Sequence, residues 1–217
     1  TEYTDAKNET YKYNYAQDNK HRVESAISVQ LMNGYRYTYD NAGNIVGVTM
    51  NSKMNDDGTI QDNNITMSAA TEYDGNKNYV VKQTDTRGKS VTYDVNGSNG
   101  LVNRSTAPIG TGGTASVDYS YNADTYQTTR VSRTVDGETV SNFFGYDSLR
   151  RLTSIYHNGF NYNLGYDQWG NRTTTKIQDQ QLSSNTYNAN NGTLAKTTYG
   201  NGDCLSYDYD RYDRVTK

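Results

Sequence analysis

The stretch YTYDNAGNIV, residues 37–46, contains the pattern that decides the fold. Tyr37 and Tyr39 alternate with polar residues, which is the period of a β-strand, so the two tyrosines lie on the same face. Asp40 follows at the start of a polar turn, where its carboxylate can accept hydrogen bonds from turn amides. Gly43 can supply the positive φ of a bulged hairpin turn, and Ile45 begins an apolar return. The stretch therefore predicts a β-hairpin.

The same pattern recurs along the chain. Most steps between its anchors are 20 to 28 residues, and the anchors fall at positions 15, 39, 73, 93, 121, 146, 166, 187 and 209. The longer step from 39 to 73 predicts a polar inserted loop near 50–70, and the segment near 107–116 predicts a Gly-rich loop. Residues 1–217 are therefore predicted to be one array of about nine hairpin units, because a fixed short period is typical of repeat proteins.

The composition supports an all-β protein and excludes several other classes. The mean hydropathy is −0.98, but 22 Tyr, 19 Gly and a single Pro argue against a disordered chain, which is usually poor in aromatic residues. A net charge of −3 with no Lys/Arg-rich run predicts no nucleic-acid partner. No apolar stretch has the length of a membrane span, so none is expected in this chain.

The repeat assigns structural roles to a set of tyrosine, aspartate and glycine residues. The predicted motif residues are Tyr39, Asp40, Gly43, Tyr146, Asp147, Tyr166, Asp167, Gly170, Tyr209 and Asp210. Arg150 and Asp213 stand where other units have Gly, which makes the turn prediction weaker there. The aromatic rows are expected to be more buried than their neighbours in sequence: Tyr37, Tyr39, Phe144, Tyr146, Tyr162, Tyr166, Tyr207 and Tyr209.

These repeats resemble the YD repeats, also called RHS repeats, of bacterial polymorphic toxins, toxin-complex cocoon subunits and teneurins. The segments that carry the resemblance are YTYDNAGNIVGV, FGYDSLRRLTSI, LGYDQWGNRTTT and GNGDCLSYDYDRYDRVTK. The resemblance implies a continuous antiparallel sheet of hairpins that spirals into a secreted or cell-surface shell. Such a shell encapsulates or presents a toxin or effector domain, and its partners are flanking repeats of the same chain and an enclosed C-terminal toxin domain.

Both ends of the chain read as interior to such an array, because the first residues already alternate and the last follow a turn. We therefore expect a segment of a longer protein. The family's self-cleaving segment contains an Asp-Pro dipeptide, whereas Pro108 follows Ala107. That chemistry is not expected in these residues.

The sequence predicts no catalytic, cofactor-binding or metal-binding residues. Cys204 with His21 or His157 matches no spacing of a nucleophilic site, and we interpret Cys204 as a small strand residue. The turn carboxylates recur with the repeat, which favours capping over acid–base catalysis. The segment NDDGTIQD, residues 55–62, resembles a calcium loop only faintly and is interpreted as a solvated loop.

A carbohydrate-binding or adhesive β-repeat module is the alternative function. Exposed aromatic faces bind sugars and quaternary ammonium groups, which makes glycans a second class of partner. Modules of that kind are usually rich in tryptophan, whereas Trp169 is the single tryptophan here and lies in a predicted turn. Loss of glycan binding on Trp169→Ala would favour this alternative.

Overall fold

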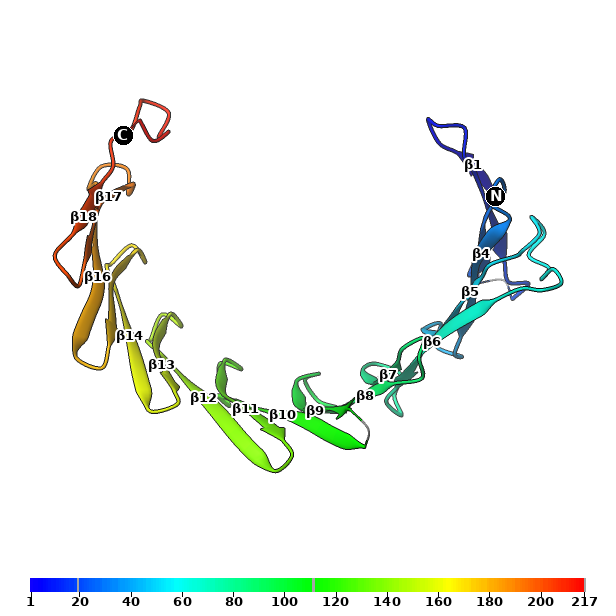
Figure 1. Ribbon diagram of the computed structural model, residues 1–217, viewed down its shortest axis with the longest axis horizontal. Coiled ribbons are helices and arrows are strands. Elements are labelled where there is room, and N and C mark those ends of the chain that lie inside the picture. The colour runs from blue at the N-terminus through cyan, green and yellow to red at the C-terminus, as the bar shows by residue number, and fades with distance from the viewer. Residues whose placement is uncertain (19, 111, 217) are drawn as a thin grey trace. The chain divides into compact units, whose positions relative to one another are not determined.

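The computed structural model describes residues 1–18, 20–110 and 112–216, and its strands confirm the all-β prediction (Figure 1). Within those residues no helix is present. The strands are β1 (Glu2–Thr4), β2 (Thr10–Tyr15), β3 (Val23–Ser28), β4 (Asn33–Tyr39), β5 (Ile45–Asn51), β6 (Thr66–Tyr73), β7 (Val80–Thr84), β8 (Ser90–Val95), β9 (Val102–Ile109), β10 (Gly113–Tyr121), β11 (Thr128–Val135), β12 (Glu138–Tyr146), β13 (Leu152–His157), β14 (Phe160–Tyr166), β15 (Arg172–Ile177), β16 (Gln180–Tyr187), β17 (Leu194–Tyr199) and β18 (Cys204–Ser206).

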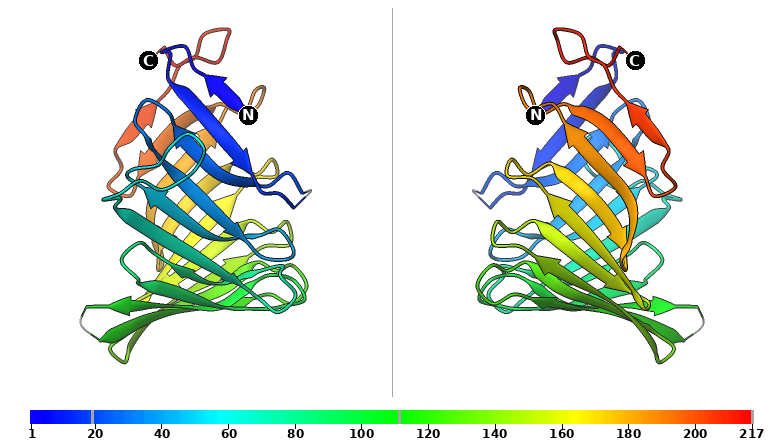
Figure 2. Two further views of the ribbon diagram at one scale, coloured as in Figure 1. Left: turned by 90° about the vertical axis from the view of Figure 1, so that its right-hand side faces the viewer. Right: turned by 90° about the vertical axis from the view of Figure 1, so that its left-hand side faces the viewer.

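The eighteen strands form one sheet in which each strand pairs antiparallel with its neighbours in sequence. The chain divides within β10 into two compact units, Thr1–Ser116 and Val117–Lys217. In the first unit, the left panel of Figure 2 shows successive N-terminal strands side by side. In the second unit, β13 pairs with β12 and β14 in the same way. Contacts between described strands join consecutive strands, so each unit is built from local pairings.

Two kinds of turn alternate along the second unit. Short turns join β11 to β12 and β13 to β14, and their central residues have positive φ: Asp136 (49°), Gly137 (86°), Asn158 (48°) and Gly159 (83°). Two consecutive residues with positive φ define the type I′ hairpin turn, for which Asp-Gly and Asn-Gly are the preferred dipeptides. Longer turns that begin with Asp or Asn occupy the opposite edge, because strand direction alternates.

The segment 52–65 between β5 and β6 packs onto the sheet of the first unit. Met54 is 0% exposed, and its amide donates to the carbonyl oxygen of Met32 at 2.7 Å. The Lys12 Nζ atom lies 3.0 Å from the Asp56 carboxylate, and a Cβ added at Gly58 would lie 2.9 Å from the Ser25 Oγ atom. The interpretation of residues 55–62 as a solvated loop is therefore wrong in part, because this segment covers β2 and β3.

Two other sequence assignments differ from the structure. Tyr93 and Asp94 were expected to start a turn, but both lie inside β8, where Asp94 pairs with Arg104. The turn begins at Asn96, after a register shift between Asp94 and Val95, so Val95 occupies the place that Tyr holds in other units. The predicted Gly-rich loop near 107–116 is mostly strand, because β9 continues to Ile109 and β10 begins at Gly113.

The aromatic rows are half-buried. Tyr37, Tyr39, Tyr207 and Tyr209 are more buried than adjacent residues 36, 38, 206 and 208, as predicted. In β14 the prediction of a contrast is wrong, since Asn161 and Asn163 fall in the same burial class as Tyr162. Ile27 and Met54 are the buried hydrophobic side chains of the described residues. Because few side chains of the described residues are fully buried, the stability of the sheet depends largely on contacts between neighbouring strands.

Candidate functional site: the edge of repeated turns

The longer turns share one hydrogen-bonding arrangement, centred on their first residue. The Asp40 Oδ1 atom accepts from the amides of Gly43 and Asn44 at 2.9 and 3.0 Å, and its Oδ2 atom accepts from the Asn44 side chain at 3.2 Å. The Asp167 carboxylate accepts from the amides of Trp169 and Asn171 and from the Asn171 side chain. Asp147 and Asp210 hold the turns 147–151 and 210–214 in the same way. We call this set of turns, with those that begin at residues 16, 74, 96, 122 and 188, the turn edge.

Each of these turns needs a residue in the left-handed region. Gly43 has a φ of 99° and Gly170 a φ of 92°, and a Cβ at either position would meet nothing within 4 Å. Arg150 and Asp213, with φ of 64° and 59°, occupy the same place. The turn therefore keeps its conformation without Gly, at the cost of a strained backbone.

Five of the tyrosines that precede a turn donate a hydrogen bond to the preceding strand. The Tyr166 hydroxyl donates to the carbonyl oxygen of Leu152, the first residue of β13, at 2.8 Å. The other members of the series join Tyr39 to Val23 (2.7 Å), Tyr146 to Thr128 (2.9 Å), Tyr187 to Arg172 (2.9 Å) and Tyr209 to Leu194 (2.8 Å). The tyrosine thus fixes the start of one strand to the end of the next.

Side chains of one turn also reach the following turn. The Arg151 Nε atom donates to the Asp147 carboxylate at 2.7 Å, and its Nη1 atom donates to the carbonyl oxygen of Asp167 at 2.8 Å. The guanidinium lies 4.8 Å from the centre of the Tyr166 ring, within cation–π range. Arg22 makes the corresponding contacts with Asp18, Tyr39 and Asp40. Asn44, Gln127 and Asn191 bridge further pairs of turns.

The hydrogen bonds lower the pKa values of the turn carboxylates. Backbone and side-chain donation from Arg151 lowers the pKa of Asp147, and partial burial opposes this only in part. At Asp40, burial acts to raise the pKa, but donation from Asn44 and Gly43 outweighs it, and the pKa is lowered. These carboxylates are ionised near neutral pH with their oxygens occupied, which suits capping and not proton transfer.

Cys204 and His157 are not brought together, and the Asp57 carboxylate has partners within its own segment. Cys204 is exposed in β18 and His157 ends β13, two strands of the second unit with no contact to each other. The Asp57 carboxylate accepts from the amide and hydroxyl of Thr59. The described residues contain no group of three or more side chains placed to hold a metal ion, and no helix long and apolar enough to cross a membrane.

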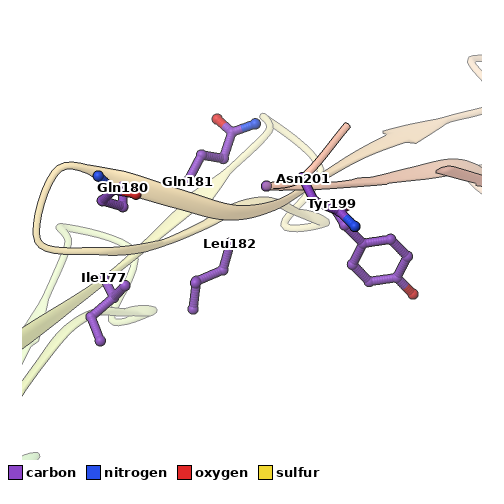
Figure 3. Close-up of a pocket in the computed structure, with 7 residues that line it drawn as sticks. Ile177, Gln180, Gln181, Leu182, Tyr199 and Asn201 are labelled. Carbon is purple, nitrogen blue, oxygen red and sulfur yellow. The ribbon is translucent and has the colours of Figure 1, made fainter. Parts of the chain in front are cut away.

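Two open cavities lie on the second unit. The first, of about 530 Å³, is lined by Ile177, Leu182 and Tyr199 beside the turn between β17 and β18, and Figure 3 shows the rim that these side chains form with Gln180, Gln181 and Asn201. The second, of about 700 Å³, lies between the turn 167–171 and the turn 188–193. It includes Trp169, which at 71% is the most exposed large hydrophobic residue of the described part of the chain.

No family model and no curated protein sequence matches the chain. Among solved structures, the chain is similar in fold to TcdB2-TccC3-Cdc42, with a TM-score of 0.54 and 11% identity over 94% of this chain. It is similar to TcdB2-TccC3 without the hypervariable C-terminal region, with a TM-score of 0.54 and 11% identity over 99% of this chain, and to TcdB2-TccC3, with 0.53 and 12% over 94%. The chain spans 14% of the length of each of these chains.

Proposed function

We propose that the chain is a wall segment of a larger shell built from YD-type repeats, and that its role is structural. The observation that carries this proposal is the series of contacts along the turn edge, in which Tyr166 and Arg151 join consecutive hairpins. Such contacts let one hairpin be added to the next without a separate core, which is what a wall of indefinite length requires.

The shell would encapsulate or present a toxin or effector domain. Support comes from the fold that the chain shares with TcdB2-TccC3. The chain matches only 14% of the length of those chains, which is consistent with one segment of a larger wall. One of those structures is described as lacking a hypervariable C-terminal region, which supports a variable domain carried after the repeats. The main partners of this chain would be flanking repeats, and the assembly would be secreted or held at the cell surface.

We expect no enzymatic activity from the wall itself. The geometry that its turns share uses the carboxylates of Asp40, Asp147, Asp167 and Asp210 as hydrogen-bond acceptors. A carboxylate that already accepts two or more hydrogen bonds in its ionised form is a poor general base, because its pKa is lowered.

The enclosure can be tested in the longer protein that contains these repeats. Residues 147–166 would be deleted, which removes one hairpin in phase, or residues 147–157 would be deleted, which removes one strand and breaks the phase. We expect a carried domain to resist protease in the intact and in-phase proteins and to become sensitive in the out-of-phase protein. Equal protease sensitivity of that domain in all three proteins would overturn the encapsulating role.

A further inference from the structure

The cavity between the turns 167–171 and 188–193 has features that the structural role does not need. Its volume of about 700 Å³ is within the range of small-molecule sites. One wall carries Trp169, and the other carries the Asn-rich segment 188–191. The turn edge is held by Asp167 and Asn188, so neither the indole nor the side chain of Asn190 is required for the turn itself.

The indole of Trp169 is left uncovered, in a turn whose backbone is fixed by hydrogen bonds. Its backbone amide donates to the Asp167 Oδ1 atom at 3.0 Å, which fixes the residue in its turn, while the side chain remains 71% exposed. A ligand that covers an exposed aromatic ring removes its apolar surface from water, which favours binding. The corresponding place in the turn 147–151 is taken by Leu149, which shows that the turn does not demand an aromatic residue.

Polar groups without partners face the same cavity. The Asn190 amide, the Thr173 hydroxyl and the Trp169 indole N–H have no hydrogen-bond partner among the described residues, and all three residues line the cavity. Together they offer two donors, an acceptor and a hydroxyl beside an aromatic face. The lining contains no Lys or Arg, and the oxygens of its one carboxylate, Asp167, are occupied by turn donors.

We propose that this cavity is a binding site for a neutral saccharide. A sugar ring has one face of C–H groups that can cover the Trp169 indole, and its hydroxyls can exchange hydrogen bonds with Asn190 and Thr173. The absence of a basic side chain from the lining disfavours an anion, and the occupied Asp167 carboxylate gives little attraction for a cation. This site is independent of the wall role and adds a recognition function to one repeat.

The single tryptophan makes the site directly observable. The folded chain would be titrated with chitotriose, cellotriose and maltotriose, each to about 10 mM, while the emission of Trp169 is followed, since weak sites bind in the millimolar range. We expect a saturable change with at least one of them. Asn190→Ala should weaken that affinity by about two- to tenfold, the effect of one lost hydrogen bond.

A matched control moves the fluorophore to a turn of the same geometry. The double variant Trp169→Leu/Leu149→Trp places the indole in the turn 147–151, and we expect no saturable response there. Ligand-observed NMR should show that Trp169→Leu no longer binds the saccharide, while its circular-dichroism spectrum is unchanged. No saturable response to any saccharide, a response that follows the indole to residue 149, or binding of phosphocholine alone would each overturn the proposal.

Discussion

Replacement of Tyr166 by Phe removes one hydroxyl and leaves the ring and its contact with Arg151. The hydroxyl donates to the Leu152 carbonyl at 2.8 Å in a part-buried position. A hydrogen bond of this kind contributes about 1 kcal/mol to the free energy of unfolding, and the carbonyl that loses its donor keeps some access to water. We therefore expect Tyr166→Phe to lower the stability of the second unit by about 1 kcal/mol.

Tyr162 provides the matched control in the same strand. It lies in β14 in the same burial class as Tyr166, and its hydroxyl has no hydrogen-bond partner among the described residues. Tyr162→Phe should change the free energy of unfolding by less than about 0.5 kcal/mol. Urea denaturation would be combined with amide hydrogen exchange in β13 and β14, because repeat arrays can depart from two-state unfolding.

The comparison of the two variants tests the recurring tyrosine bond. Equal losses in Tyr162→Phe and Tyr166→Phe would refute the reasoning, because the loss would then come from the ring environment and not from the bond. The series also predicts additivity within the second unit: the combined Phe variant of Tyr146, Tyr166 and Tyr209 should lose about 3 kcal/mol, since distant sites add. Tyr166→Ala should cost more than Tyr166→Phe, and a loss below about 0.5 kcal/mol would show that the ring contributes nothing to the sheet.

Four further predictions concern the turns and the segment 52–65. Gly170→Ala should cost about 1 kcal/mol because its φ of 92° is strained for Ala, and Arg150→Gly should gain about 0.5 kcal/mol, both by urea denaturation. The pKa of Asp147 is lower in the folded chain than its value of about 4 in the unfolded chain, so the carboxylate stabilises the fold at pH values above about 4. This stability is lost as the pH falls through the folded pKa. In Asp147→Asn the free energy of unfolding should therefore fall less steeply with acid. Met54→Ala should destabilise the first unit by about 3 kcal/mol in thermal or urea unfolding, because the side chain is fully buried.

The hairpin array was predictable because its signals are local. Alternation before Tyr39, the capping Asp40 and the positive φ of Gly43 all lie within a few residues of one another. Asp136-Gly137 and Asn158-Gly159 are an equally local signal for the short turns. These dipeptides also locate the second edge of the sheet in the sequence.

The features that the sequence did not predict depend on contacts that the spacing of residues does not encode. Val95 replaces the usual tyrosine before its turn, and the nearby Tyr93-Asp94 dipeptide therefore directed the prediction two residues too early. Burial of Met54 follows from the folding of 52–65 onto β2 and β3, a tertiary contact within an otherwise polar segment. The partners of Arg151 and Tyr166 likewise lie in a neighbouring turn and strand, where no local pattern indicates them.

Duplication of one complete unit tests the central claim most directly. A second copy of residues 147–166 would be inserted after Tyr166, so that the new junction restores a Tyr-Asp pair, and stability would be measured by urea denaturation with circular dichroism. The account predicts a soluble β protein at least as stable as the original, because each hairpin is held by its neighbours in sequence. An inserted copy of residues 147–157 should disrupt the fold. Loss of folding with the complete unit, or equal tolerance of both insertions, would contradict the account.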